Sequence, residues 1–313
     1  MDVINQIRAK AKSSTKVIVL PEYNDARIQQ AAKVIEEEGI AKVVVLSPDK
    51  IPSDKKRIYI EEFYRLRKSK VPGLDIKIVE RIFEDTLYSA AIMTRLGEVD
   101  GFVAGASHTT ADMARAAIYC LEVDSLFGYV CSSFIMIVPD CRLGENGLFI
   151  FADCGIIPEP NPSQLAAICL ASVDLGRKVL NLLPRVAFLS YSTHGSSRDK
   201  IADKIKEALE IVKSRNPDLL VDGELQVDAA IVPEVAHKKY PNSPLGGRAN
   251  ILIFPNLEAG NISYKLVERL AKARALGPLI MGTTKPCSDL SRGCSVEDIV
   301  DVVAITSIRA QAG

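Results

Sequence analysis

The chain has 313 residues, of which 48% are hydrophobic and 25% are charged. This composition is typical of a globular protein with a large core, and at about 150 residues per domain it predicts two domains. Because 39 Lys and Arg residues balance 39 Asp and Glu residues, no global positive field attracts nucleic acid or anionic lipid, so any anion must bind locally. No long apolar stretch and no signal-peptide pattern is found, so we expect a cytoplasmic protein without a membrane partner.

The sequence argues against several enzyme classes. Its seven cysteines form no C-x-x-C pair and it has only three histidines, so we expect reduced thiols, no disulfide framework and no metal site. The G-x-G-x-x-G, G-x-x-x-x-G-K-[ST], G-x-S-x-G and H-E-x-x-H motifs are all absent. Dinucleotide-binding, P-loop, serine-hydrolase and zincin functions therefore lose most of their support.

Short β-branched runs alternate with longer helix-period segments along the chain. The runs predict buried strands at 16–20, 42–46, 101–104, 186–189, 250–254 and 279–281. Apolar residues recurring every three or four positions predict helices at 26–38, 112–121, 162–182, 199–213 and 261–275. Two further apolar runs, 134–138 and 148–151, flank a turn-rich stretch that predicts antiparallel pairing. The predicted fold class is α/β with a mostly parallel, mixed sheet.

Polar residues follow several predicted strands, at the sheet edge where α/β proteins bind ligands. In the stretch 105–115, a hydroxyl-rich turn leads into a helix with Thr110 as the expected N-cap and Arg115 about one turn further. Such a helix start with a guanidinium can bind phosphate, but a capped surface helix with a solvated arginine explains the same residues. The loop 191–197, with Ser192 and Thr193, leaves a similar choice between anion binding and a turn with local hydrogen bonds.

The stretch 289–298 combines a hydroxyl, a guanidinium and carboxylates ahead of an apolar helix. Ser295 and Asp298 match a capping box, so a structural role alone could explain Asp298. Cys294 and Cys141 could be nucleophiles, but a free cysteine more often acts as a small buried hydrophobe.

Several separated blocks together resemble the phosphate acetyltransferase (phosphotransacetylase) family across essentially the whole chain. They are Val17-Ile-Val-Leu-Pro-Glu22, Tyr64-Arg-Leu-Arg-Lys68, His108-Thr-Thr-Ala-Asp112 with Arg115, Phe151-Ala-Asp-Cys154, Leu189-Ser-Tyr-Ser-Thr193, Val227-Asp-Ala-Ala230, Pro241-Asn-Ser-Pro244, Ile253-Phe-Pro-Asn-Leu257 with Ala259-Gly-Asn261, and Asp289-Leu-Ser-Arg-Gly293. The resemblance implies two α/β domains with an interdomain cleft, similar to isocitrate and isopropylmalate dehydrogenases. Domain 1 would comprise residues 1–126 plus 278–313, and domain 2 residues 127–277. A homodimer is usual in the family.

The implied reaction is acetyl-CoA + phosphate ⇌ acetyl phosphate + CoA, with no cofactor or metal and with CoA as a substrate. The resemblance maps catalysis onto Ser291, Arg292 and Asp298, and it places Arg115 and Arg67 near phosphate or CoA. We expect Asp298 to take the proton of the CoA thiol, which is mostly protonated at neutral pH. Arg292 and Ser291 would stabilise the developing charge, and Arg115, helped by Ser192 and Thr193, would hold the phosphate.

One residue departs from the family pattern, and two other functions compete with acetyl transfer. Family members commonly have proline after the arginine equivalent to Arg115, whereas this chain has Ala116. The phosphate butyryltransferase branch lacks the D-L-S-R-G motif, so acetyl is preferred over butyryl. A decarboxylating dehydrogenase would need a metal-binding set of aspartates and a nicotinamide site, and neither is found. A catalytically silent CoA- or phosphate-binding module is disfavoured by the intact Ser291-Arg292 pair and Asp298.

Overall fold

A computed structural model describes residues 3–197 and 200–312 of the chain. The Cα positions divide into two compact units, one formed by Met1–Asp124 with Thr283–Gly313 and the other by Ser125–Gly282. Each unit has its own strands and helices. Within the described residues, none of the helices combines the length and the apolar character needed to cross a membrane.

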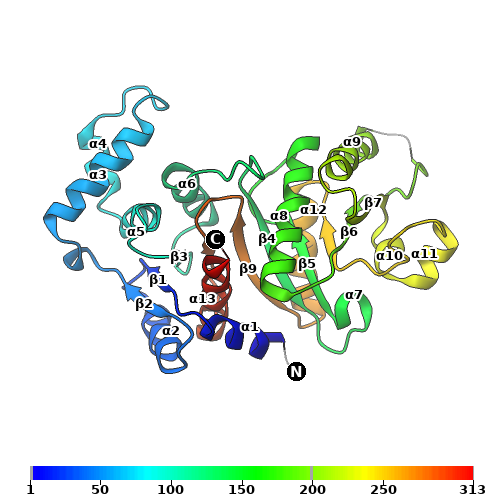
Figure 1. Ribbon diagram of the computed structural model, residues 1–313, viewed down its shortest axis with the longest axis horizontal. Helices are drawn as coiled ribbons and strands as arrows, with labels where there is room; N and C mark the ends of the chain where they lie inside the picture. The colour runs from blue at the N-terminus through cyan, green and yellow to red at the C-terminus, as the bar shows by residue number, and fades with distance from the viewer. Residues whose placement is uncertain (1–2, 198–199, 313) are drawn as a thin grey trace. The chain divides into compact units, whose positions relative to one another are not determined.

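The first unit is built on parallel strands in the order β2-β1-β3-β10. Its elements are α1 (Val3–Lys12), β1 (Val17–Leu20), α2 (Ala26–Glu37), β2 (Lys42–Val45), the short 3₁₀ helix η1 (Pro48–Lys50), α3 (Ser53–Arg67), α4 (Ile76–Ile82), α5 (Thr86–Arg95), β3 (Gly101–Ala104), α6 (Thr110–Cys120), β10 (Cys287–Asp289) and α13 (Val296–Gln311). Helix α13 packs on β1 and β3, and α1 and α2 both contact α13 (Figure 1). Helix α5 contacts β3, and α6 contacts β10. The C-terminal segment thus supplies both a strand and a helix to the unit formed by the N-terminal residues.

The second unit has a mixed sheet in the order β9-β4-β5-β8-β6-β7. Its elements are β4 (Cys131–Ile137), α7 (Leu143–Asn146), β5 (Leu148–Ala152), α8 (Pro162–Leu180), β6 (Arg185–Leu189), α9 (Lys200–Arg215), β7 (Leu220–Leu225), α10 (Val227–Ile231), α11 (Pro233–Lys239), β8 (Ile251–Ile253), α12 (Leu257–Leu270) and β9 (Arg274–Met281). The predicted antiparallel pair is confirmed, because β4 pairs antiparallel with β5, and also with β9. The remaining pairs, β5–β8, β8–β6 and β6–β7, are parallel.

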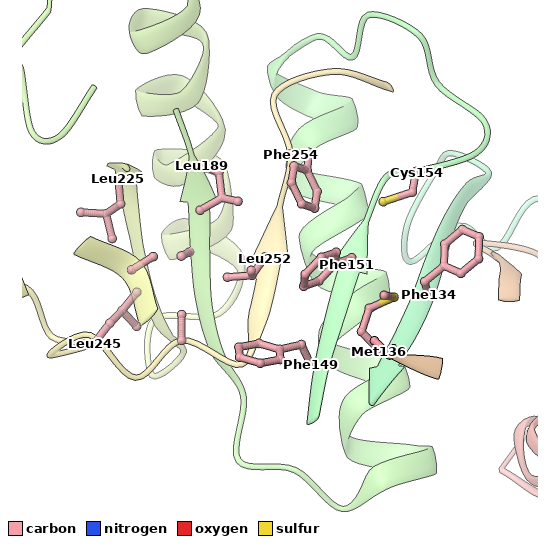
Figure 2. Packing of buried hydrophobic residues seen from close by; sticks show 14 residues of the cluster. Phe134, Met136, Phe149, Phe151, Cys154, Leu189, Leu225, Leu245, Leu252 and Phe254 are labelled. Carbon is pink, nitrogen blue, oxygen red and sulfur yellow. The ribbon is translucent and has the colours of Figure 1, made fainter. Parts of the chain in front are cut away.

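The alternation of side chains along β5 divides the core of the second unit into two faces. Phe149 and Phe151 belong to a buried cluster with Phe134 and Phe254, shown in Figure 2, and Tyr264 of α12 stacks on Phe134 at a ring-centroid distance of 4.2 Å. Ile150, between the two phenylalanines, faces Gly176 of α8 instead. Successive residues of a strand point to opposite faces, so α8 and α12 cover opposite sides of this sheet.

The predicted elements are mostly confirmed, with two kinds of error. The predicted helix 261–275 is wrong at its end: α12 stops at Leu270, Lys272 has a left-handed φ of 53°, and β9 begins at Arg274. The strands β7 and β10 were not predicted, because Asp222-Gly223-Glu224 and Ser288-Asp289 are poor strand formers. The predicted helix 199–213 corresponds to α9, and residue 199 lies outside the described residues.

Candidate active site

The carboxyl ends of β1, β3 and β10 carry the residues that the sequence singled out in the first unit. The register pairs Asp289 at the end of β10 with Ala104 at the end of β3, and Leu290 donates its N–H to the carbonyl of Ala104 at 2.8 Å. The loop after β10, with Ser291 and Arg292, therefore lies beside the loop after β3, which leads into α6. Parallel strands bring residues distant in sequence to one edge in this way.

The loop after β3 is wrapped around a carboxylate of the chain itself. Glu22, only 5% exposed, accepts the backbone N–H groups of Gly105, Ala106, Ser107 and His108 at 2.8–3.0 Å. The hydroxyl of Ser107 and Nδ1 of His108 complete the arrangement at 2.9 and 2.8 Å. These amides, part of the donor-rich turn predicted as an anion site, thus already bind an anion.

His108 lies between two carboxylates, because its Nε2 contacts Asp85 at 3.1 Å while Nδ1 contacts Glu22. Hydrogen bonds to Asp85 and Glu22 raise the pKa of His108 from 6.5 to about 10. Burial favours a higher pKa for Glu22, but hydrogen bonds from His108 and Ser107 outweigh it and lower the pKa from 4.5 to about 2. An imidazolium flanked by carboxylates is therefore part of the folded unit at neutral pH. Sequence analysis missed this trio, and its one signal was Pro21-Glu22 directly after the first strand.

Ser291, Arg292 and Asp298 lie on one short segment between β10 and the first turn of α13. Ser291 and Arg292 are exposed, and Asp298 is half-buried. The predicted capping box is confirmed. The hydroxyl and the backbone N–H of Ser295 donate to Asp298 Oδ2 at 2.7 and 2.9 Å. In return, the backbone N–H of Asp298 donates to the Ser295 hydroxyl at 3.1 Å. The carboxylate of Asp298 is thereby held at the positive end of the α13 dipole.

Asp289, the first residue of the D-L-S-R-G segment, is fully buried. Its Oδ1 accepts the N–H of Leu290 at 3.0 Å, and its Oδ2 has no hydrogen-bond partner among the described residues. Gly105 packs so closely that a Cβ there would lie 2.1 Å from Oδ1. Burial raises the pKa of Asp289 to about 7. This side chain packs the start of the loop against β3.

Arg115 lies in the second turn of α6, and its side chain is 48% exposed. The predicted N-cap Thr110 is wrong, because Thr109 caps the helix. Thr109 stands three residues before Asp112, the spacing of a capping box, and the two residues form that box. Arg115 contacts the same Asp112 at 2.9 Å. Its guanidinium is therefore partly neutralised but remains open to solvent.

Arg67 ends α3 and stacks its guanidinium over the ring of Tyr119 at 4.1 Å from the centroid. Within the part of the chain that the structure describes, its buried Nε has no hydrogen-bond partner. Tyr119 lies four residues after Arg115 on α6, so the two side chains lie on one face of that helix. Arg67, stacked on Tyr119, therefore lies along the same face. The arginines that the family resemblance assigned to phosphate or CoA thus share a surface of the first unit.

Ser192 and Thr193 belong to the second unit, where they follow β6 and are buried. The Ser192 hydroxyl donates to Glu224 Oε1 at 3.1 Å, and the Thr193 hydroxyl accepts the N–H of Gln226 at 3.0 Å. Gly195 N–H also donates to Glu224 at 2.6 Å. The Ser192 hydroxyl also accepts the local N–H of Ser197 at 3.0 Å, so both hydroxyls already have hydrogen-bond partners in the second unit, and their part in anion binding stays a prediction.

A cavity of about 370 Å³ opens beside the Glu22–His108 pair and is lined by Pro21, Glu22, Tyr23, Asn24, Asp25, Pro48, Glu84, Asp85, Thr86, Ser107 and His108. Four of these residues are carboxylates, of which Glu22 and Asp85 contact the His108 ring and Asp25 contacts Arg27. Across the described residues, His, Cys, Asp and Glu side chains form no group of three or more that could hold a metal ion.

Comparison with known proteins supports the family that the motifs indicated. The family described as phosphate acetyl/butaryl transferase matches residues 2–307. The phosphate acetyltransferase of Thermoanaerobacterium thermosaccharolyticum is 46% identical over 330 residues, covering 99% of this chain and 100% of the relative. That of Acetivibrio thermocellus is 44% identical, covering 99% of both chains.

Solved structures agree with these sequence relatives. A phosphotransacetylase from Streptococcus pyogenes superposes with a TM-score of 0.91 at 32% identity, covering 99% of this chain and 98% of that chain. A branched-chain phosphotransacylase from Enterococcus faecalis, at 19% identity and a TM-score of 0.65, covers 94% of this chain and 99% of that chain and shares the fold. On the full-length sequence match, this chain belongs to the phosphate acetyl/butaryl transferase family.

Proposed function

We propose that this chain catalyses acetyl-CoA + phosphate ⇌ acetyl phosphate + CoA. The observation that carries the proposal is the exposed Ser291-Arg292 pair in the segment between β10 and α13, the helix that carries Asp298, in a chain matched over its full length by phosphate acetyltransferases. An assay of CoA-dependent acetyl phosphate consumption tests it. Turnover should require both CoA and acetyl phosphate, and no turnover with either acyl phosphate or acyl-CoA would overturn the proposal.

In the direction of acetyl-CoA synthesis, the thiol sulfur of CoA attacks the carbonyl carbon of acetyl phosphate. The C–S bond forms, the C–O bond to phosphate breaks, and inorganic phosphate leaves with the bonding electron pair. A thiol with a pKa of about 8.5 needs a base at neutral pH, and Asp298 is the carboxylate assigned to take the proton. The same carboxylate caps α13, where the Ser295 hydroxyl and N–H contact its Oδ2.

Arg292 and Ser291 are assigned to the charge that develops on the carbonyl and phosphate oxygens. Their exposure suits groups that must reach a substrate, and removing one such donor typically costs about 10²–10³ in kcat. The attack is direct, in a ternary complex, without an acetyl-cysteine. Burial raises the pKa of Cys294 to about 11, which opposes a nucleophilic role, and initial-rate plots should therefore intersect.

Arg115 is assigned to phosphate, and Arg67, which ends α3 and stacks on Tyr119 of α6, to phosphate or CoA. Both assignments rest on cationic groups that are exposed or half-buried, and guanidinium groups suit phosphate oxygens. The proposal gives Ser192 and Thr193 a smaller share in holding phosphate, because each hydroxyl would have to exchange a hydrogen bond that it already makes. Acetyl is preferred over butyryl because the D-L-S-R-G segment is intact.

We also propose that the enzyme is cytoplasmic and forms a homodimer. Its two domains would enclose a cleft, as in isocitrate dehydrogenase-like folds. The dimer is supported by a row of apolar side chains on α12: Ile262, Leu266 and Leu270 are 58%, 52% and 81% exposed. They recur every four residues and so share one helix face, as expected for a helix that packs on a second subunit. Sedimentation of the purified chain should give the dimer mass.

A further inference from the structure

Arg27, in the first turn of α2, uses its whole guanidinium to join three loops at the carboxyl edge of the first unit. Nε and Nη2 bond the two oxygens of Asp25 at 3.0 and 2.7 Å, and Nη2 also donates to the carbonyl of Ala106 at 2.8 Å. Nη1 donates to the carbonyls of Arg292 and Cys294, both at 2.9 Å. Arginine has five N–H donors, and these five contacts use all of them.

Two of these contacts hold the backbone on either side of Gly293. Within this turn, the Cys294 N–H donates to the carbonyl of Ser291 at 2.8 Å, and the Gly293 N–H donates to the Ser291 hydroxyl at 3.3 Å. The turn is exposed from Ser291 to Gly293. A short exposed turn with so few bonds of its own depends on Arg27 for its conformation.

We propose that Arg27 is the positioning residue of the catalytic loop: by binding the Arg292 and Cys294 carbonyls, it orients Ser291 and Arg292 relative to Asp298. Arg27 does not contact substrate in this assignment. The inference rests on the proposed function for its kinetic consequence, but the loop contacts themselves do not depend on it. Pairing with Asp25 alone would account for two of the donors and leaves the three carbonyl contacts unexplained.

Arg8, on α1, provides a matched control. It contacts Asp301 and Glu297 of α13 at 2.7 and 2.5 Å and Glu38 at 3.1 Å. Like Arg27, it ties distant segments together, but its partners are carboxylates and none is in the 291–294 turn. Arg8→Gln therefore removes contacts with Glu297 and Asp301 but leaves the capping bonds of Asp298 and the loop backbone in place.

The kinetic test compares wild type with Arg27→Lys, Arg27→Gln and Arg8→Gln. Lysine keeps the charge, but its single nitrogen cannot reproduce the planar fork. Displacement of reacting groups by about 1 Å can cost about 10² in rate, so kcat of Arg27→Lys should fall about 10²-fold, with KM for CoA changed less than about threefold. Arg8→Gln should lower the melting temperature but keep kcat within about threefold.

Cys294 supplies a readout that does not need acetyl transfer. Its Sγ lies 3.6 Å from Arg27 Nη1, and the residue is only 7% exposed. If the turn loosens, iodoacetamide should label Cys294 about tenfold faster in both Arg27 variants, and peptide mass spectrometry locates the label. Buried Cys120 of the same unit reports global unfolding and should label at the wild-type rate in both Arg27 variants.

The two readouts separate the possible failures. Wild-type kcat in folded Arg27→Lys would overturn the positioning role, whatever the labelling shows. A lower kcat with unchanged Cys294 labelling would also overturn it, because Arg27 would then act on substrate directly. If the wild-type chain shows no acetyl transfer, the proposed function fails, and faster Cys294 labelling in Arg27→Lys would still establish that Arg27 holds the loop.

Discussion

Two loops of this protein follow parallel strands and are rich in hydrogen-bond donors, yet they use those donors differently. In the first unit, the amides of residues 105–108 surround the Glu22 carboxylate, which also bonds His108. In the second unit, the loop at 192–195 directs a hydroxyl and one amide to Glu224 Oε1, while Oε2 of Glu224 lacks a partner among the described residues.

The comparison shows that donor density does not measure the capacity to bind a substrate anion. Each loop satisfies many of its donors with a buried carboxylate from a neighbouring segment, as buried polar groups require. What remains for a substrate in the first unit is a set of side chains that project beyond the loops, namely Ser291, Arg292 and Arg115. In the proposed function, substrate binding at this edge is assigned to these exposed side chains, whereas the amides of 105–108 are bonded to Glu22.

The largest expected effect comes from neutralising the two buried carboxylates in parallel. Glu22→Gln places an amide against several N–H donors and leaves His108 with one charged partner, so it should lower the free energy of unfolding by about 4 kcal/mol. Glu224→Gln keeps the bonded oxygen and puts the amide where Oε2 has no partner, so it should cost at most about 1 kcal/mol. Urea unfolding of both variants measures the difference, and equal losses would remove the distinction between the loops.

The same trio predicts a pH dependence of stability confined to the first loop. The pKa of Glu22 is lowered from 4.5 to about 2, so its contribution is complete above 4.5 and is lost as pH falls toward 2. The pKa of His108 is raised from 6.5 to about 10, so its contribution is complete below 6.5 and is lost as pH rises toward 10.

Unfolding free energies of wild type and His108→Gln measured across pH test this dependence. The stability difference between the two proteins should be largest from pH 4.5 to 6.5 and shrink on both sides. A difference that stays constant from pH 6 to 10 would show that His108 is not charged in the folded protein.

A smaller effect, on KM, is expected from removing one of the exposed side chains. Arg115→Ala should raise KM for phosphate and acetyl phosphate about tenfold, the value of one exposed charge-assisted contact of about 1.4 kcal/mol, and should change KM for CoA less. Arg65→Ala is the matched control, since Arg65 is a surface arginine paired with Glu62. If CoA were the substrate most affected by Arg115→Ala, Arg115 would belong to the nucleotide end of the site.

The sequence predicts the parts of this edge that depend on local patterns. β-Branched runs predict β1 and β3, and Ser-x-x-Asp predicts the capping box at Ser295. The pairing of Glu22 with the amides of 105–108 could not be predicted, because it depends on the neighbouring positions of β1 and β3 in the folded sheet. β10 was missed for the same reason: its three residues form a strand through pairing with β3, without a strand-like pattern of their own.

The most direct test of the catalytic account is kcat of Asp298→Asn measured beside its melting temperature. Asparagine can still accept the bonds from Ser295, so a mere cap would lose at most about 1 kcal/mol of stability and little activity. A general base contributes about 10²–10⁴ in rate, and asparagine cannot take the thiol proton. The account predicts a folded variant with kcat at least about 10²-fold lower and little change in KM for CoA, whereas a folded variant with kcat within about tenfold of wild type would make Asp298 a structural cap and contradict it.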